Sequence, residues 1–164
     1  MSGPVGAGAE DPTYDFSAIT DQLFIAVRPR FRHLESVRAL GVSLVLSTLW
    51  FAPAVEFRSP HFELVSLPMI DFPLFPIPLR TLRRGVEAAL PVLDSGGRVL
   101  VYCRAGRHRS VALTCCILIA RGMSADEAMD LVVAKRPVAD PHASHIEARI
   151  RAFERDWRGR RATE

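Results

Sequence analysis

V-L-V-Y-C-R-A-G-R-H-R-S, residues 99–110, is the stretch around which this 164-residue chain is organised. Its first four residues are apolar, β-branched or aromatic, a pattern that predicts a buried strand. The apolar run 111–120 is too long for a strand, and Gly122 follows it closely, so we predict a helix ending there. Between strand and helix lies a short loop that begins with Cys103 and closes with Arg109.

The loop combines a thiol with the features of an anion site. A strand–loop–helix turn aims backbone N–H groups and a helix N-terminus at one point, where an anion binds. The same positive field should lower the pKa of the Cys103 thiol. Arg109, separated from Cys103 by five residues, can offer a planar fork to two oxygens of one phosphate. The sequence therefore predicts a phosphate cradle that contains a thiolate nucleophile.

The rest of the chain predicts an α/β fold in a single domain. Strands are expected within residues 19–27, 42–49 and 62–67, and helices over 31–40, 79–93, 125–135 and 143–157. Because each strand is followed by a loop or a helix, we expect a mixed, largely parallel sheet flanked by helices. Residues 1–15 are predicted to form a flexible tail, 16–157 the domain, and 158–164 a basic C-terminal tail.

Composition narrows the class of protein and its surroundings. A net charge of +3 suits an acidic partner and does not predict nucleic-acid binding. Three cysteines form no disulfide framework, which favours a reducing, cytoplasmic setting. No signal-peptide pattern is present and no apolar run approaches 18 residues, so no membrane span is expected. The sequence leaves the oligomeric state open.

Residues 68–78, P-M-I-D-F-P-L-F-P-I-P, contain four prolines and a single charge, Asp71. The prolines exclude regular structure. Asp71 could cap a turn, but a carboxyl among apolar residues should have a raised pKa and could hold a proton near neutrality. We therefore predict that Asp71 is a proton donor. Four other carboxyl groups are weaker candidates for this role, because each is expected in a different setting. These are Glu56 in an earlier loop, Glu63 in a strand, Glu87 in a helix and Asp94 in a turn.

The segment Cys103 to Ser110 resembles the Cys-x5-Arg-Ser/Thr signature of cysteine-dependent protein tyrosine phosphatases, and the chain resembles their dual-specificity branch. The resemblance implies a cysteinyl-phosphate intermediate, with Asp71 on a mobile acid loop and Ser110 stabilising the departing thiolate. It also implies a phosphate-binding loop, which here comprises Arg104, Ala105, Gly106, Arg107, His108 and Arg109. The implied substrates are proteins phosphorylated on tyrosine, serine or threonine, or another acidic phosphorylated molecule such as an inositol lipid headgroup. No cofactor is implied.

Two positions depart from that family pattern. Tyr102 stands where the family commonly has the histidine that helps to tune the thiol, so the degree of activation of Cys103 is open. Pro76 stands where dual-specificity members often have an asparagine, five residues after the aspartate. The hydrogen bonding within the acid loop must therefore differ from the usual pattern.

Two other functions compete with a phosphatase. A rhodanese-like sulfurtransferase also has a Cys-led loop after a strand, but that loop is typically one residue shorter and has no use for Asp71. A phosphate-binding module without catalysis would not need nucleophile, arginine and acid together. Cys115 and Cys116 are expected in the core. His142 and His145 lack an evident third ligand, so no metal site is expected.

Overall fold

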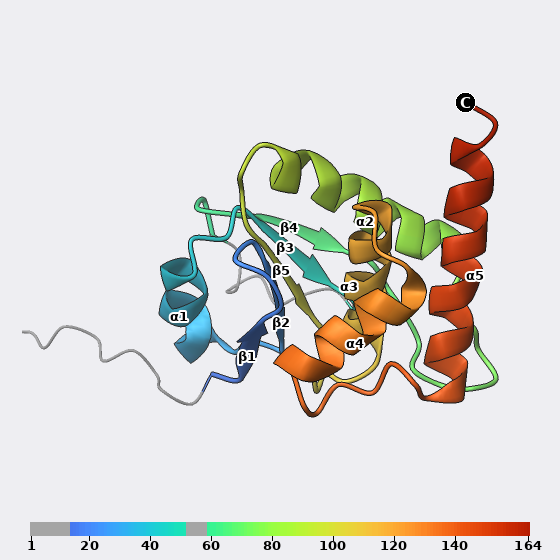
Figure 1. Cartoon of the computed structure of the whole chain (residues 1–164). Helices are drawn as coiled ribbons and strands as arrows, with labels where there is room; N and C mark the ends of the chain where they lie inside the picture. Colours follow the sequence, from blue (N-terminus) through green and yellow to red (C-terminus); the bar gives the residue numbers. More distant parts are fainter. Residues whose placement is uncertain (1–13, 52–58) are drawn as a thin grey trace, which may run out of the picture.

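The computed structural model describes residues 14–51 and 59–164, which form a five-stranded sheet with helices on both faces (Figure 1). The strands are β1 (Phe16–Ala18), β2 (Leu23–Ala26), β3 (Leu44–Ser47), β4 (Glu63–Ser66) and β5 (Val99–Tyr102). The helices are the 3-10 turn η1 (Phe31–His33), α1 (Leu34–Ala39), α2 (Leu79–Asp94), α3 (Arg109–Ala120), α4 (Ala125–Lys135) and α5 (Ser144–Arg161).

The sheet has the order β1-β2-β5-β3-β4, with β5 at its centre. The pairs β2–β5, β5–β3 and β3–β4 are parallel, and only β1 runs antiparallel, against β2. This arrangement confirms the predicted mixed, largely parallel α/β sheet. The carboxyl ends of the parallel strands meet at one edge, which is where α/β proteins usually bind ligands. The loop that begins at Cys103 leaves the sheet at the middle of this edge.

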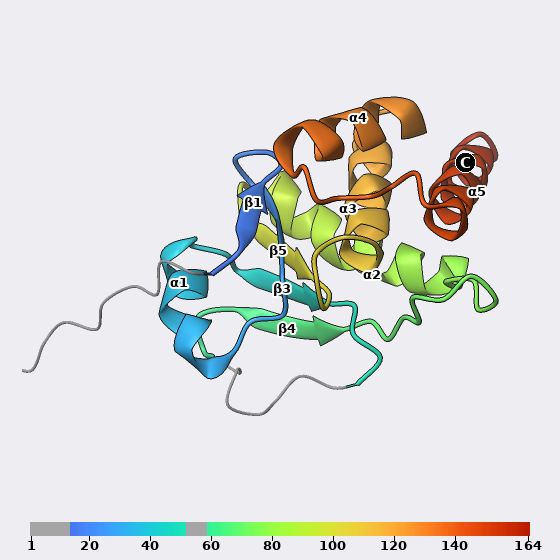
Figure 2. The same cartoon turned by 90° about the horizontal axis from the view of Figure 1, so that it is seen from below.

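Alternating side chains of the central strands supply two cores. Val99 and Val101 face the larger core together with α2, α3, α4 and α5, whereas Leu100 and Tyr102 face the smaller one beside α1. Figure 2 shows α1 on the opposite side of the sheet from α2 to α5. Helix α3 lies in the middle of the larger core, and every residue from Ser110 to Ala120 is buried. The helix that follows the loop is therefore part of the core.

Several predicted boundaries need correction. The predicted N-terminal tail reaches residue 15, yet Tyr14 is buried and Asp15 is paired with Arg136, so these two residues belong to the domain. Residues 158–161, predicted as tail, continue α5, because i,i+4 ion pairs such as Arg158–Glu154 (2.8 Å) support its last turns. Strand β1 was not predicted, since three residues are too few to show a period. None of the described helices is long and apolar enough to cross a membrane.

Candidate active site

The loop between β5 and α3 wraps around the sulfur of Cys103. The backbone N–H of Gly106 donates to Cys103 Sγ at 3.2 Å, and Ser110 Oγ lies 3.1 Å from the same sulfur. Gly106 has a φ of +61°, a left-handed conformation that lets the chain turn back over the thiol. Cys103 itself is only 2% exposed. Loop and helix thus converge on this sulfur, as predicted.

The pKa of Cys103 is lowered, in the predicted direction. Burial alone acts to raise this pKa, but hydrogen bonds from the Ser110 hydroxyl and from the backbone of Ser110 and Arg107, together with the Arg109 charge, outweigh it. For Cys115 and Cys116 burial is the largest influence, and it raises their pKa values. Both lie in the larger core, as predicted. Cys103 is therefore the thiol that ionises most easily.

Arg109 begins α3 and retains a free donor. Its Nη1 donates to the carbonyl of Met69 at 3.3 Å, which links the loop to the segment that carries Asp71. Its Nε is buried, and no atom of the described residues accepts a hydrogen bond from it. A buried guanidinium N–H without a protein acceptor is suited to an oxyanion. The side chain of Arg107, by contrast, is 58% exposed and lies 3.7 Å from Asp140.

Asp71 lies beside the loop, held by two histidines. His108 Nδ1 is 2.9 Å from Asp71 Oδ2, and His145 Nε2 is 2.7 Å from Asp71 Oδ1. Burial acts to raise the pKa of Asp71, but the hydrogen bonds from His145 and His108 and the charge of Arg109 bring it below its ordinary value. The predicted raised pKa is therefore wrong, because the apolar neighbours in sequence are not the neighbours in space.

Tyr102 has its side chain on the other face of the sheet from α3. Strand alternation places its ring in the smaller core, where burial raises its pKa. Its carbonyl accepts hydrogen bonds from the backbone N–H of Thr48 at 3.0 Å and from Thr48 Oγ1 at 2.9 Å. These bonds fix the end of β5 directly before Cys103.

Arg136 is a residue of the site that the sequence did not predict. It is 1% exposed, and its Nε donates to the carbonyl of Gly106 at 2.7 Å. Its Nη1 and Nη2 form a fork on Asp15 at 2.9 and 3.0 Å, and Nη2 also donates to Ala105 at 3.3 Å. Arg136 thus holds the loop from behind. Its position before a proline at a helix end gave only a boundary signal.

His145 and Asp140 were not predicted at the site either. His142 and His145 have different partners, since His142 lies 3.2 Å from Glu147 while His145 contacts Asp71. His108 Nε2 lies 3.6 Å from Asp140 Oδ2, too far for a hydrogen bond. Of the rival acids, Glu63, Glu87 and Asp94 are exposed on other elements, and Glu56 lies outside the described residues.

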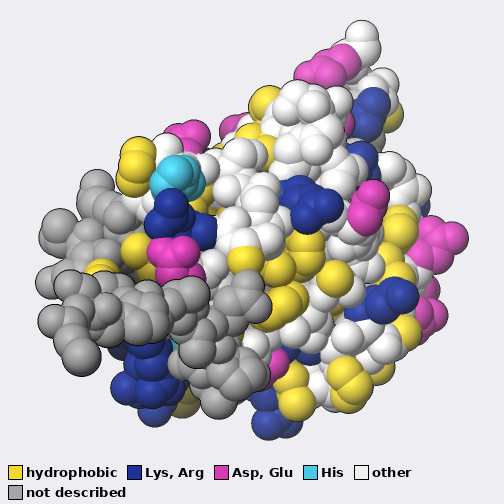
Figure 3. All heavy atoms as spheres, turned by 90° about the vertical axis from the view of Figure 1, so that its left-hand side faces the viewer, with side chains coloured by type: hydrophobic (Ala, Val, Ile, Leu, Met, Phe, Trp, Pro, Cys, Tyr) yellow, Lys and Arg dark blue, Asp and Glu magenta, His cyan; other side chains and the backbone are white. Residues whose placement is uncertain are grey.

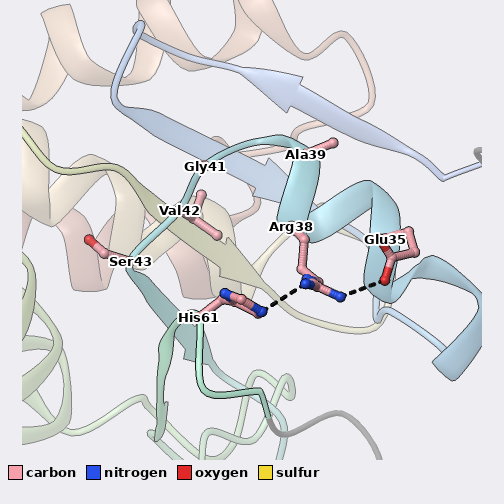
Figure 4. A pocket seen from close by; sticks show the side chains of 7 residues that line it. All are labelled: Glu35, Arg38, Ala39, Gly41, Val42, Ser43 and His61. Atoms are coloured by element: carbon pink, nitrogen blue, oxygen red, sulfur yellow. Dashed lines mark hydrogen bonds and ion pairs between the residues drawn. The ribbon is translucent and has the colours of Figure 1, made fainter.

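A separate pocket lies far from this loop. Its lining includes Arg38, which contacts Glu35 at 2.8 Å and His61 at 2.7 Å (Figure 4). Figure 3 shows the α1 side of the molecule, where basic, acidic and hydrophobic side chains are mixed. Because Val42 and Ser43 of the lining precede β3, the pocket lies at the amino ends of the strands, opposite to the Cys103 edge.

Comparison with known proteins shows the family to which the chain belongs. Residues 23–156 match the family model "Dual specificity phosphatase, catalytic domain". Dual specificity phosphatase 28 of mouse is 30% identical over 128 residues, covering 77% of each chain. Its human counterpart is 32% identical over 109 residues, covering 66% of this chain and 60% of that protein.

A solved structure agrees over nearly the whole chain. The crystal structure of a mouse putative dual specificity phosphatase complexed with zinc tungstate has a TM-score of 0.79 and 27% identity, and 96% of each chain is covered. Sequence motif, fold and matched family model agree, and the chain belongs to the dual-specificity phosphatases, a family of cysteine-dependent phosphatases.

Proposed function

We propose that Cys103 is the nucleophile of this phosphatase and that the loop from Arg104 to Arg109 binds the phosphoryl group. The observation that carries the proposal is the environment of the Cys103 sulfur, buried and yet with a lowered pKa. The unpaired Nε of Arg109 is the complementary donor for an equatorial oxygen. A non-catalytic phosphate-binding module would gain nothing from a thiol of lowered pKa at the base of its loop.

The reaction has two steps. The Cys103 thiolate attacks phosphorus in line, so that an S–P bond forms while the P–O bond to the leaving group breaks. Arg109 and the loop N–H groups hold the equatorial oxygens as charge develops. Water then attacks the cysteinyl phosphate, and the thiolate departs toward the Ser110 hydroxyl, which lies 3.1 Å from the sulfur.

Asp71 is the proposed acid in the first step and base in the second. In the structure its carboxylate accepts hydrogen bonds from His108 and His145, which favours the ionised form. To protonate a leaving group, Asp71 must leave these histidines, by rotation of its side chain or by movement of the 68–78 segment. The hydrogen bond between Arg109 and Met69 would report such movement, since it spans the loop and this segment.

The proposed substrate is a protein phosphorylated on tyrosine, serine or threonine, acted on in the cytoplasm. Names of the relatives support a dual-specificity activity. The side chains of Arg104 and Arg107 are exposed beside the loop and favour an acidic substrate. An inositol lipid headgroup or another non-protein phosphate offers the same charge and is the second candidate. Cys103, Cys115 and Cys116 are not joined in disulfides, a pattern that fits a reducing compartment such as the cytoplasm.

The deciding experiment compares phosphate release from an aryl phosphate, a phosphotyrosine peptide and a phosphoinositide with sulfur transfer from thiosulfate to cyanide. We expect phosphate release that is lost in Cys103→Ser and retained in Cys116→Ala, a matched change of a core cysteine. Transfer of sulfur to cyanide without phosphate release would instead support the sulfurtransferase alternative. Hydrolysis retained in Cys103→Ser would place the nucleophile elsewhere.

A further inference from the structure

We propose that Asp71, His108 and His145 form a zinc-binding site at the rim of the loop, and that zinc bound there keeps Asp71 from acting as an acid. The first half of this proposal concerns binding alone. The second half rests on the proposed role of Asp71 in catalysis. Neither half uses the Cys103 thiolate as a ligand.

Three separate segments bring the ligand atoms together. Asp71 comes from the proline-rich segment after β4, His108 directly precedes α3, and His145 is the second residue of α5. One ligand atom from each residue can be chosen so that all lie within 4.8 Å of one another. Zinc bound at about 2.0–2.2 Å in tetrahedral geometry places its ligands roughly 3.3 Å apart. The two histidines contact different oxygens of Asp71, His108 at 2.9 Å to Oδ2 and His145 at 2.7 Å to Oδ1, so zinc binds either through both carboxylate oxygens or after one histidine shifts to the other oxygen.

The donor set favours zinc over the hard cations magnesium and calcium. Two imidazole nitrogens and one carboxylate oxygen form a zinc ligand set with a fourth position open to water. Magnesium and calcium prefer oxygen donors, so a site with two nitrogens disfavours them. The side chains of Asp71, His108 and His145 are 28%, 21% and 17% exposed, so an ion can reach them from solvent.

The second ring nitrogen of His108, Nε2, also has surroundings that suit zinc bound at Nδ1. Its Nε2 is buried, and no atom of the described residues makes a hydrogen bond to it. The carboxylate of Asp140 lies just beyond hydrogen-bond range, 3.6 Å away. Zinc bound at Nδ1 leaves the proton on Nε2, facing this carboxylate. A histidine ligand that donates its other N–H to a carboxylate is the usual arrangement around protein-bound zinc.

Zinc at this site has a defined effect on the reaction. It replaces the hydrogen-bonding protons between the histidines and Asp71 and occupies a lone pair of the carboxylate. Asp71 then cannot carry a proton to the leaving group. Zinc should therefore slow substrates with poor leaving groups more than those with acidic phenols, which depart without a proton.

Binding is tested first, with Co²⁺ as a spectroscopic stand-in and with Zn²⁺ in competition. The protein carries Cys103→Ser, so that the active-site thiolate is absent. We expect Co²⁺ to give a tetrahedral visible spectrum without thiolate charge transfer, and Zn²⁺ to displace it. His145→Ala should weaken Zn²⁺ binding by about tenfold or more, since even substitutions that merely reorient a ligand typically cost that much.

Two variants separate ligand loss from other effects. His142→Ala removes an exposed histidine that lies just before the same helix and should leave Zn²⁺ affinity unchanged. His145→Gln can still donate to Asp71 but removes the imidazole, and it should lose Zn²⁺ binding as His145→Ala does. Absence of Co²⁺ binding, or binding that His145→Gln leaves unchanged, would overturn the site whether or not the protein hydrolyses phosphate.

Inhibition is tested second, on the chain with Cys103 intact. Zn²⁺ should inhibit hydrolysis of a tyrosyl phosphate more strongly than that of an aryl phosphate with an acidic phenol, and His145→Gln should raise the half-inhibitory Zn²⁺ concentration by about tenfold or more. Equal inhibition of both substrates, or an unchanged concentration in His145→Gln, would place the inhibitory ion at Cys103 and refute the second half. A protein that binds Co²⁺ but lacks phosphatase activity would refute the proposed function while leaving the site in place.

Discussion

At the scale of single residues, burial alone does not decide the chemistry of the thiols. Cys103, Cys115 and Cys116 are all buried, yet the pKa of the first is lowered and the pKa values of the other two are raised. The difference lies in their partners. Gly106 and Ser110 surround the first sulfur with polar groups, whereas burial in the larger core dominates the surroundings of the other two.

The first prediction concerns selective alkylation of Cys103. Because its pKa is lowered, iodoacetate should react with this residue at a pH midpoint below the ordinary cysteine value of about 8.5, and phosphate should protect it. Mass spectrometry of the native protein across a pH series measures both effects. The Cys103→Ser variant, as control, should take up no label while folded. A midpoint above the ordinary value would mean that burial outweighs the hydrogen bonds.

The second prediction concerns Asp71, whose partners differ from those that composition suggested. Asp71→Asn should slow hydrolysis of a tyrosyl phosphate by ~10²–10⁴-fold, the usual range for general acid catalysis. It should slow an aryl phosphate with a very acidic phenol far less, because that leaving group needs no proton. Steady-state kinetics on both substrates measure the ratio, with Glu87→Gln on the exposed face of α2 as control. Equal slowing of both substrates would direct the search for the acid to Glu56.

At the scale of elements, the loop from Cys103 to Arg109 is held in its shape both by helix α3, which follows it, and by the buried Arg136. Arg136, at the end of α4, donates to two carbonyls of the loop and pairs with Asp15 before β1. Gly106 reaches its left-handed conformation directly against this guanidinium. The loop is therefore fixed between α3 and a buried arginine.

The third prediction is that Arg136→Ala destabilises the fold. The change leaves the carbonyls of Ala105 and Gly106 without their donors and opens a cavity, and we expect a loss of about 3 kcal/mol or more in the free energy of unfolding. Chemical denaturation measures the loss. Arg155→Ala, an exposed arginine of α5, should change it by less than about 0.5 kcal/mol. Similar values for the two variants would show that the loop does not depend on Arg136.

The fourth prediction is that Gly106→Ala disables the loop. The φ of +61° is strained for alanine, and a Cβ would lie 2.6 Å from Arg136 Nη2 and 3.0 Å from the carbonyl oxygen of Ala26. Hydrogen bonds to Asp15 keep that guanidinium from moving aside. We expect a fall in kcat/KM and a lower melting temperature. Gly159→Ala, in an open stretch of α5, should raise stability by up to about 1 kcal/mol. A normal kcat/KM in Gly106→Ala would show that the loop relaxes at no cost.

At the scale of the whole molecule, the sequence predicted those features that depend on residues close together in the chain. The β5–loop–α3 unit, the capping box at Ser124 and the burial of Cys115 and Cys116 all follow from neighbours in sequence or from period. The surroundings of Asp71 do not, because His108 and His145 are 37 and 74 residues away. Arg136 and Asp15 are separated by 121 residues. Such contacts depend on how elements are packed, which no local signal reports.

The fifth prediction concerns removal of metal. If charge neutralisation at the phosphate comes from Arg109 and backbone N–H groups, a chelator should not lower activity. Dialysis against EDTA should therefore leave kcat unchanged, or raise it where zinc had been bound to the purified protein. A kcat that falls on chelation and returns with a divalent ion would mean that a metal takes part in the reaction.

The burial of α3 from Ser110 onward also determines under which conditions the active site is formed. From Ala112 onward the amides of this helix donate within the helix and lie in the same core that α2, α4 and α5 complete, so they can exchange with solvent only when that core opens as a whole. Hydrogen–deuterium exchange should find α3 among the slowest segments, while the exposed end of α5 exchanges early. Heating should then abolish catalysis and tertiary structure in one cooperative transition, with no partly melted form that still turns over substrate.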